Sequence, residues 1–348
     1  MRIVHGGDVW QGGAPDEYLD FSANLNPEGP PDWVRAAMEQ GLEQARFYPD
    51  VRQSAALAGM SAHLHLWENC LLLTGGGVEA VRCAANMPLP SGDAITHVIA
   101  QPTFQEYGRL CGKHVDIPRA GLEYWVPREG DVLWVCNPNN PTGDALPRGV
   151  MLALLKRMET VGGRLIVDEA FIDYCPEFSI RDAVTDHPSL IVLGSLTKAL
   201  AVPGVRLGYL AAHPTVIFEL RENLPPWLLN CLAGAVAAAL PGHEADFEAI
   251  RVLNARRRAS FATALAELGA KVYPSDANFL LCDFGGDMRP TVEALRGRGI
   301  LVRPCDMFPG LSTGHLRLCV RTEAENGRLV DALLACGEAG QFRRATYD

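Results

Sequence analysis

Short apolar runs recur along the first two thirds of the chain. Residues 71–74, 132–136, 164–167 and 190–193 consist mainly of leucine, valine and isoleucine. Runs this short and this apolar are typical of strands that are buried on both faces of a parallel sheet. The segments between them are long enough to hold a helix, and the alternation continues to about residue 212. The pattern therefore predicts an α/β fold with a doubly wound, mainly parallel sheet and helices on both of its faces.

Polar and amphipathic segments lie towards the N-terminus of the chain. Residues 1–30 are rich in glycine, proline, aspartate and asparagine, which suits an extended arm better than a packed element. A helix is expected over residues 32–45, with Asp32 as its cap, because an amphipathic run follows that aspartate. A second helix is expected over residues 78–86, directly after three consecutive glycines.

Two adjacent prolines divide the chain further along. Pro225 and Pro226 precede a long helical region over residues 228–268, and short strands and helices alternate beyond it. We therefore expect three parts: an N-terminal arm over residues 1–30, a large domain over residues 31–235 and a small C-terminal domain over residues 236–348.

Composition narrows the class of protein. A chain of 348 residues with 48% hydrophobic content can bury a large core. It has no run of about 18 apolar residues and no apolar leader, so we expect a cytoplasmic protein without a membrane partner. The net charge of −10 argues against a nucleic-acid partner. The ten cysteines are scattered without a C-x-x-C pair, so neither a metal site nor a disulfide framework is expected.

Three polar side chains follow predicted strands at similar intervals. Asn140, Asp168 and Lys198 are 28 and 30 residues apart, and a strand–helix–strand unit takes about 30 residues. Because the carboxyl ends of parallel strands line one crevice, the three side chains are expected to converge on one ligand. Taken singly, the aspartate would more often be a strand-end acid and the lysine a solvated charge. Together they indicate an amine that condenses with an aldehyde, which points to pyridoxal phosphate.

The triple glycine at residues 75–77 lies between a predicted strand and a predicted helix. Glycines here let the backbone approach an anion while the helix N-terminus offers free N–H groups. On its own the sequence would be only a tight turn. With Asp168 and Lys198 nearby in the fold, it is expected to hold the phosphate of the cofactor.

The motifs N-N-P-T-G at residues 139–143, D-E-A at 168–170 and S-x-T-K at 195–198, followed by R-x-G, resemble those of fold-type I pyridoxal-phosphate enzymes, the aspartate aminotransferase superfamily. Within it, residues 5–7, 20–27, 48–50 and 168–173 resemble the threonine-phosphate decarboxylases of cobalamin synthesis. The histidinol-phosphate aminotransferases are closely related to these decarboxylases.

The resemblance implies a role for each cofactor-binding residue. Lys198 would carry the cofactor, Asp168 would face the ring nitrogen, Asn140 would bind the phenolic oxygen and Phe104 would lie on the ring face. The residues expected around the cofactor phosphate are Gly76, Gly77, Val78, Ser195, Thr197 and Arg206, together with Tyr48 of a neighbouring subunit. The last assignment implies a homodimer.

The resemblance also implies a substrate site. Arg317 would bind the α-carboxylate, and Arg303, His5 and Asn24 would bind the phosphate of a small phosphorylated amino acid. Phe171 stands where aminotransferases usually have tyrosine. The decarboxylases have phenylalanine at this position, although neutral drift would give the same residue.

The expected reaction is decarboxylation of L-threonine O-3-phosphate to (R)-1-amino-2-propanol O-2-phosphate. A histidinol-phosphate-type aminotransferase is the alternative. A catalytically silent or DNA-associated protein would need Lys198 or Asp168 to be lost, or a basic domain to be added, and the sequence has neither feature.

Overall fold

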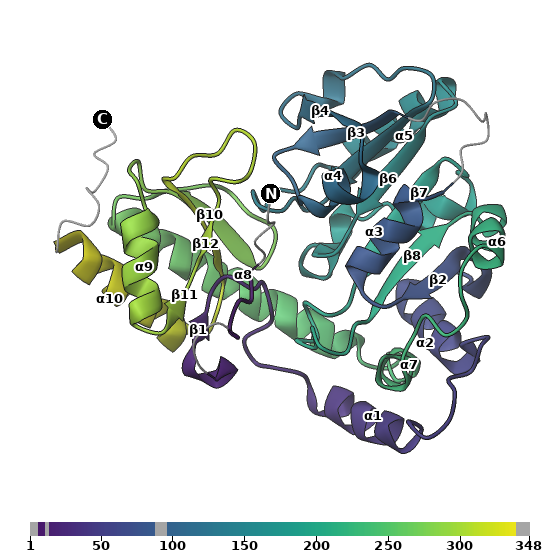
Figure 1. Ribbon diagram of the computed structural model, residues 1–348, viewed down its shortest axis with the longest axis horizontal. Helices are drawn as coiled ribbons and strands as arrows, with labels where there is room; N and C mark the ends of the chain where they lie inside the picture. The colour runs from purple at the N-terminus through teal and green to yellow at the C-terminus, as the bar shows by residue number, and fades with distance from the viewer. Residues whose placement is uncertain (1–5, 11–13, 88–95, 339–348) are drawn as a thin grey trace.

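A seven-stranded sheet forms the centre of the larger of two lobes (Figure 1). The computed structural model describes residues 6–10, 14–87 and 96–338. The strands lie in the order β2-β8-β7-β6-β5-β3-β4. Their bounds are β2 (Leu71–Thr74), β3 (Thr96–Gln101), β4 (His114–Pro118), β5 (Asp131–Cys136), β6 (Arg164–Asp168), β7 (Leu190–Ser195) and β8 (Gly208–Ala212). Only β8 runs in the opposite direction to the other six strands, so the predicted mainly parallel sheet is confirmed.

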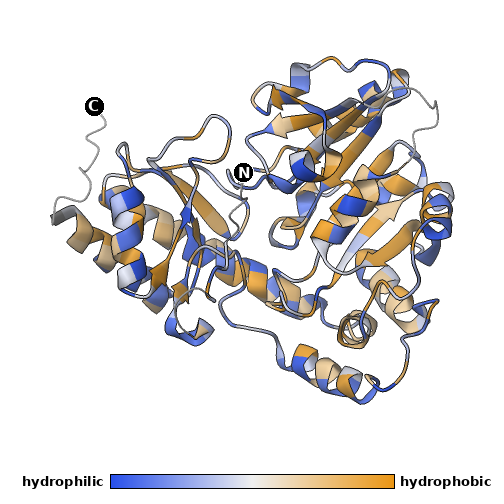
Figure 2. Ribbon diagram, in the orientation of Figure 1, coloured by the Kyte–Doolittle hydropathy of each residue, from blue (hydrophilic) through white to orange (hydrophobic). Residues whose placement is uncertain are grey.

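Helices cover both faces of this sheet. One face packs against α1 (Asp32–Glu43), α2 (Ser54–Leu64), α5 (Arg148–Thr160) and α7 (Cys231–Ala238), and the other against α3 (Gly77–Ala85), α4 (Glu106–Cys111) and α6 (Pro214–Glu222). Successive residues of β5 alternate between the two cores, with Leu133 in one and Trp134 in the other. Figure 2 shows these central strands as the most hydrophobic elements of the molecule. Burial on both faces explains why the strands appear in the sequence as unbroken apolar runs.

The start of α1 differs from the expectation. Pro31 occupies the cap position and no side chain caps the helix there, so Asp32 is the first helical residue and not the cap. Proline's fixed φ suits the residue before a helix, and the Asp32 carboxylate in the first turn complements the positive end of the helix dipole.

The smaller lobe is built on a four-stranded antiparallel sheet. Its strands are β9 (Lys271–Val272), β10 (Phe279–Asp283), β12 (Arg303–Pro304) and β13 (His315–Cys319), in the order β12-β13-β10-β9. Helices α8 (Glu244–Glu267), α9 (Arg289–Gly297) and α10 (Glu323–Glu338) pack beside it. Six short 3-10 helices also occur in the described ranges, at Pro15–Glu17, Glu68–Cys70, Leu122–Tyr124, Ile172–Tyr174, Pro176–Phe178 and Arg181–Thr185.

The two lobes are joined by α8 and by the N-terminal segment. Phe247, near the start of α8, belongs to the core of the large lobe, whereas Phe261 belongs to that of the small lobe. Figure 1 shows α8 extending from one lobe to the other. The N-terminal strand β1 (Leu19–Asp20) pairs with β11 (Ile300–Leu301), which fixes this segment to the small lobe. The domain limits drawn from the sequence stay a prediction, with α8 shared by both cores.

All ten cysteines are free, and eight of them are buried. Within the described ranges, no helix is long and apolar enough to cross a membrane. The same residues contain no group of three or more histidine, cysteine or acidic side chains placed to hold a metal ion.

Candidate active site

A cavity of about 270 Å³ lies between the two lobes. The carboxyl ends of β5, β6 and β7, the N-terminal segment and the small sheet all contribute to its wall. Most residues expected from the sequence line it, namely Asn24, Gly77, Val78, Phe104, Asn140, Asp168, Ser195, Thr197, Lys198, Arg206, Arg303 and Arg317. Side chains from three separate parts of the chain therefore meet at one site.

Lys198 lies in the turn that follows β7. Its Nζ atom is 6.0 Å from the centre of the Phe171 ring. Burial, together with the positive charges of Arg317 and Arg206, lowers the pKa of this amine from 10.5 to about 8. A sizeable fraction of the amine is therefore neutral near pH 8, which is the form that attacks a carbonyl group.

Asp168 is the last residue of β6 and is buried. Tyr107 donates a hydrogen bond of 2.6 Å from its hydroxyl to Asp168 Oδ2, and the Ala170 N–H donates one of 2.9 Å to Oδ1. Burial raises the pKa of the carboxyl, while these hydrogen bonds and Lys198 act in the opposite direction. A cationic group bound beside Asp168 would favour its ionised form.

Tyr107 belongs to the site but was not among the residues expected from the sequence. It is fully buried in α4, and its ring stands edge-on to Phe104 with the centroids 5.6 Å apart. A tyrosine one helical turn after a proposed ring-stacking residue is the only signal that the sequence offers. The hydrogen bond to Asp168 joins residues 61 positions apart and depends on the tertiary fold.

An anion cradle lies at the start of α3. Gly76 has φ +91°, and a Cβ atom at this position would come within 2.5 Å of Arg206 Nη2, so only glycine fits. Across from this turn, Ser195 Oγ and Thr197 Oγ1 are 2.8 Å apart. Hydroxyl groups, a guanidinium and the N-terminus of α3 together suit a phosphate group.

Asn140 and Arg317 are in direct contact. Arg317 Nη1 donates to Asn140 Oδ1 at 2.5 Å and Nη2 donates to the Ser22 carbonyl oxygen at 2.6 Å. The third donor, Arg317 Nε, is buried and has no partner among the described residues. Burial lowers the pKa of Arg317 to about 10, and the charge of Arg303 adds to that effect. A carboxylate entering the cavity would offset both penalties.

The Arg303 side chain is buried, and its guanidinium group makes no hydrogen bond or ion pair within the part of the chain that the structure describes. Its nearest aromatic contact is the Phe308 ring, 5.7 Å from the guanidinium carbon. The Asn24 Oδ1 atom in the same wall is also buried without a described partner. A buried, unpaired arginine is costly unless an anion binds it, so this end of the cavity is suited to an anionic group.

Four other residues singled out from the sequence have distinct positions. Phe171 lines the cavity and stands edge-on to Phe279, 5.0 Å away. Gly76 lies beside Arg206 and is not part of the cavity wall, and Tyr48 is 83% exposed outside it, against Trp227. His5 lies outside the described residues.

These features fit pyridoxal phosphate. The cradle matches its phosphate, the Asp168 carboxylate matches a protonated ring nitrogen, and the Lys198 amine matches its aldehyde. The Phe104 side chain lines the same cavity and supplies an apolar surface for the ring.

Comparison with known proteins agrees with this arrangement. Residues 16–333 match the family described as aminotransferase class I and II. The threonine-phosphate decarboxylase of Salmonella typhimurium is 33% identical over 96% of each chain. The histidinol-phosphate aminotransferase of Symbiobacterium thermophilum is 32% identical over 92% of this chain and 90% of the relative. The crystal structure of L-threonine-O-3-phosphate decarboxylase from Porphyromonas gingivalis superposes with a TM-score of 0.82 at 26% identity, over 91% of this chain and 99% of that one.

Proposed function

The chain belongs to the aminotransferase class I and II family, and from that membership we propose that it decarboxylates L-threonine O-3-phosphate with pyridoxal phosphate as its cofactor. The product would be (R)-1-amino-2-propanol O-2-phosphate, the phosphorylated amino alcohol used in cobalamin synthesis. Similarity to threonine-phosphate decarboxylases over nearly the full length of both chains supports the proposal.

The cofactor, when bound, supplies an aldehyde that links to the substrate amine and a ring that accepts the electron pair released at Cα. Lys198 would hold the cofactor by its aldehyde, since its lowered pKa keeps part of the amine neutral. Asp168, held by Tyr107, keeps the ring nitrogen protonated. Asn140 binds the phenolic oxygen, and Phe104 packs on the ring.

The cofactor phosphate is gripped by the anion cradle, in which Ser195, Thr197 and Arg206 face the N-terminus of α3. Tyr48 adds a contact from a second subunit. Support for this dimer comes from Trp227, whose exposed ring lies 4.9 Å from that of Tyr48, and from the exposed side chains of Leu42, Phe47 and Val51 in the same stretch of chain as Tyr48. Large apolar side chains gathered on one face favour an interface. Sedimentation of the purified protein would test the assembly.

The observation that carries the substrate assignment is the pairing of Arg303 with Arg317. The two residues are direct partners on β12 and β13, and both line the cavity that contains Lys198. Two separate cations match a substrate with two anionic groups, an α-carboxylate on Arg317 and a phosphate on Arg303. Asn24 and His5 complete the phosphate site in this proposal.

The two anchors decide which bond at Cα breaks. With both ends of the substrate held, Arg317 and Arg303 would orient it so that the bond from Cα to the carboxylate is the one placed for cleavage. The substrate then loses CO₂ and gains one proton at Cα. Phe171, which has no hydroxyl to compete for the phenolic oxygen, agrees with the decarboxylases in this respect.

A histidinol-phosphate-type aminotransferase is the second candidate. Similarity to the enzyme of Symbiobacterium thermophilum, 32% identical over 92% of this chain, supports it. The anchors for a phosphorylated substrate would serve either reaction, since the two candidates share the same cofactor residues.

The two functions are separated by their co-substrates. The purified protein with pyridoxal phosphate is expected to consume L-threonine phosphate without any 2-oxo acid, and the Lys198→Ala variant is expected to be inactive and to lack the visible absorption band of the bound cofactor. Consumption of histidinol phosphate that requires 2-oxoglutarate, with no turnover of threonine phosphate, would instead establish the aminotransferase.

A further inference from the structure

Asn26 is hydrogen-bonded to the turn that carries Lys198. Its backbone N–H donates to the Lys198 carbonyl oxygen at 3.0 Å, and its Nδ2 donates to the Ala199 carbonyl oxygen at 3.1 Å. Asn26 is buried and comes from the N-terminal segment, more than 170 positions away in the chain. Two consecutive carbonyl groups of the lysine turn are thus fixed by one residue.

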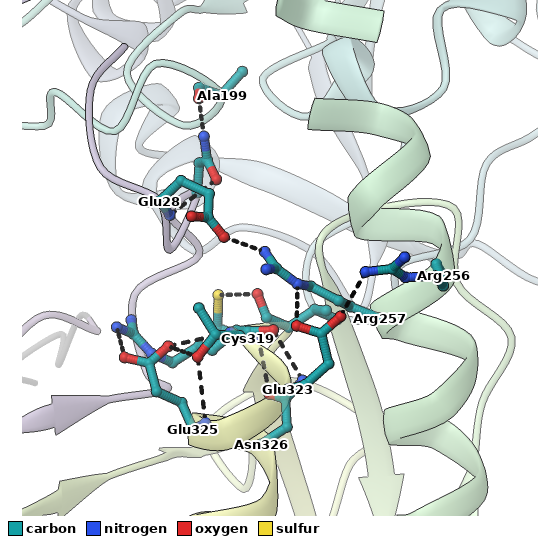
Figure 3. A network of polar contacts seen from close by, with 12 residues as sticks. Glu28, Ala199, Arg256, Arg257, Cys319, Glu323, Glu325 and Asn326 are labelled. Atoms are coloured by element: carbon teal, nitrogen blue, oxygen red, sulfur yellow. Dashed lines mark hydrogen bonds and ion pairs between the residues drawn. The ribbon is translucent and has the colours of Figure 1, made fainter. Parts of the chain in front are cut away.

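Asn26 is itself held in place by a series of polar contacts, the relay, which runs through Glu28 and Arg257 to Glu323 (Figure 3). The Glu28 backbone N–H donates to Asn26 Oδ1 at 3.2 Å, and the Glu28 carboxylate lies 2.6 Å from Arg257 Nη1. Arg257 Nε also pairs with Glu323 at 2.9 Å. The contacts therefore connect helices α8 and α10 to the Lys198 turn through residues 26–28.

Arg257 and its neighbour Arg256 differ in their connection to this relay. Both pair with Glu323 at 2.9 Å. The Arg257 side chain is 10% exposed and also reaches Glu28, whereas that of Arg256 is 72% exposed and, among the described residues, contacts Glu323 alone. A partly buried ion pair is screened less by solvent than an exposed one, so the Arg257 contacts are the stronger link.

The same N-terminal segment contacts the substrate side of the cavity. The Ser22 carbonyl oxygen accepts a hydrogen bond of 2.6 Å from Arg317 Nη2, and the Phe21 carbonyl oxygen accepts one of 2.9 Å from the Cys319 N–H. Arg317 and Lys198 are therefore linked through residues 22–26. Movement of Arg317 on binding a carboxylate would be transmitted to the lysine turn by this short stretch of chain.

We propose that Asn26 is a positioning residue for Lys198, held in place by the Glu28–Arg257–Glu323 ion pairs. Lysine has four rotatable side-chain bonds, so the backbone of its turn must be fixed for the amine to stay in reach of its target. Asn26 fixes that backbone, and the ion pairs set where Asn26 lies relative to the small lobe. This inference rests on the proposed role of Lys198 as the reactive amine.

A purely structural role for Asn26 would change stability alone, so the test measures the reactivity of Lys198. The cofactor-free full chain is treated with formaldehyde and cyanoborohydride over a range of pH, and methylation of Lys198 is followed by peptide mass spectrometry. The groups whose charges act on this amine, Arg206, Arg317, Asp168 and the Cys319 thiol, are unchanged in every variant, and only Asn26→Asp adds a charge next to the turn. The variants are Asn26→Ala, Asn26→Asp and Arg257→Ala.

The parent is expected to react with a midpoint near pH 8. In Asn26→Ala the loosened turn admits water, so the midpoint should rise by about one pH unit. The loaded enzyme should lose about 5- to 30-fold in kcat, with KM changed by less than about threefold, because the Nδ2 hydrogen bond to the turn is lost and the Ala199 carbonyl oxygen loses its partner. Asn26→Asp keeps the acceptor for Glu28 but removes the Nδ2 donor, and should behave in the same direction.

Arg257→Ala tests the relay if the Asn26 variants fail to fold. It should lower kcat by about 2- to 5-fold, and added salt should reduce the parent's advantage over it. Arg256→Ala, which removes the neighbouring arginine from the same carboxylate, should leave kcat and the methylation midpoint unchanged. Asn254→Ala is the control for lost stability, because Asn254 is also buried and also donates to a backbone carbonyl, that of Ala277 at 3.3 Å.

The experiment distinguishes a failure of the proposed function from a failure of the positioning role of Asn26. If another lysine of the parent reacts and Lys198 does not, the proposed function loses its reactive amine. If Lys198 of the parent reacts with its midpoint near pH 8, but the Asn26 and Arg257 variants match the parent in midpoint and kcat, the positioning role alone is wrong. Equal effects of Arg256→Ala and Arg257→Ala would also contradict the relay.

Discussion

Arg303 and Arg317 are paired directly across the antiparallel strands β12 and β13, so two buried guanidinium groups stand side by side in the wall of the cavity. Like charges placed opposite each other in a sheet are destabilising. The pKa of each arginine is lowered by burial, and the charge of Arg303 lowers that of Arg317 further. The pair is therefore a site whose stability depends on bound anions.

Arg303→Ala should weaken phosphate recognition while sparing the cofactor. Loss of a charge-assisted contact should cost roughly 2–4 kcal/mol, or about 30- to 1000-fold in kcat/KM for threonine phosphate. Plain threonine should be affected far less, so the variant should discriminate poorly between the two. Steady-state kinetics with both substrates measures this, and equal losses for both would show that Arg303 binds something other than the phosphate.

Inorganic phosphate should stabilise the parent more than an Arg303→Met variant. Methionine removes the second charge and keeps the apolar stem, so the variant should be more stable than the parent in the absence of anions. Phosphate should then raise the unfolding temperature of the parent by mass action and have a smaller effect on the variant. Thermal unfolding of the cofactor-loaded proteins measures both shifts. A phosphate-induced rise of the same size in both proteins would place the anion elsewhere.

Lys198→Met should stabilise the cofactor-free protein in a pH-dependent way. Folding lowers the pKa of Lys198 from 10.5 to about 8, so the folded state penalises the charged amine. That penalty is absent above about pH 10.5, grows as the pH falls, and is complete below about pH 8. At pH 7 the gain in the free energy of unfolding should be about 3 kcal/mol. Denaturant unfolding at pH 7 and pH 10.5 compares the two, and a gain that is independent of pH would contradict the lowered pKa.

Asp168→Asn should fold but lose activity severely. The neutral amide cannot hold a ring nitrogen in its protonated form, and a loss of about 10²–10⁴-fold in kcat is the minimum expected. Near-normal turnover, with the cofactor band retained, would show that another acid faces the ring.

Tyr107→Phe should produce a milder version of the same defect. The Asp168 carboxylate would lose its 2.6 Å hydrogen bond while keeping its charge and the Ala170 contact. We expect a decrease of about 10- to 100-fold in kcat, the cost of one hydrogen bond to a charged group. The pH dependence of the cofactor absorption separates this role from simple packing, because a higher carboxyl pKa should move its acidic limb to higher pH. An unchanged pH profile would leave Tyr107 with a packing role only.

Residues at the ends of parallel strands were the easiest part of the site to predict. Asn140 and Lys198 follow buried strands and Asp168 is the last residue of one, and parallel strands end at one edge of a sheet. The antiparallel direction of β8 had no comparable signal, because it depends on how the chain returns after the lysine turn.

Contacts between distant segments were harder to predict. The sequence places Arg303 and Arg317 on separate short strands, but only the register of β12 and β13 brings them together. Tyr107 and Asn26 were missed because their hydrogen bonds to Asp168 and to the lysine turn join segments that are far apart in sequence. The roles of His5 and Tyr48 stay predictions, the first outside the described residues and the second dependent on a partner subunit.

The most direct test of the account is the fate of the substrate carboxylate. L-Threonine O-3-phosphate labelled in its carboxyl carbon is incubated with the holoenzyme in the absence of any 2-oxo acid, and labelled CO₂ and phosphorylated amine are both measured. Decarboxylation should give equal amounts of CO₂ and 1-amino-2-propanol O-2-phosphate, with neither formed by Lys198→Ala. Retention of the label in the amino acid, together with transfer of its amino group once 2-oxoglutarate is added, would contradict it.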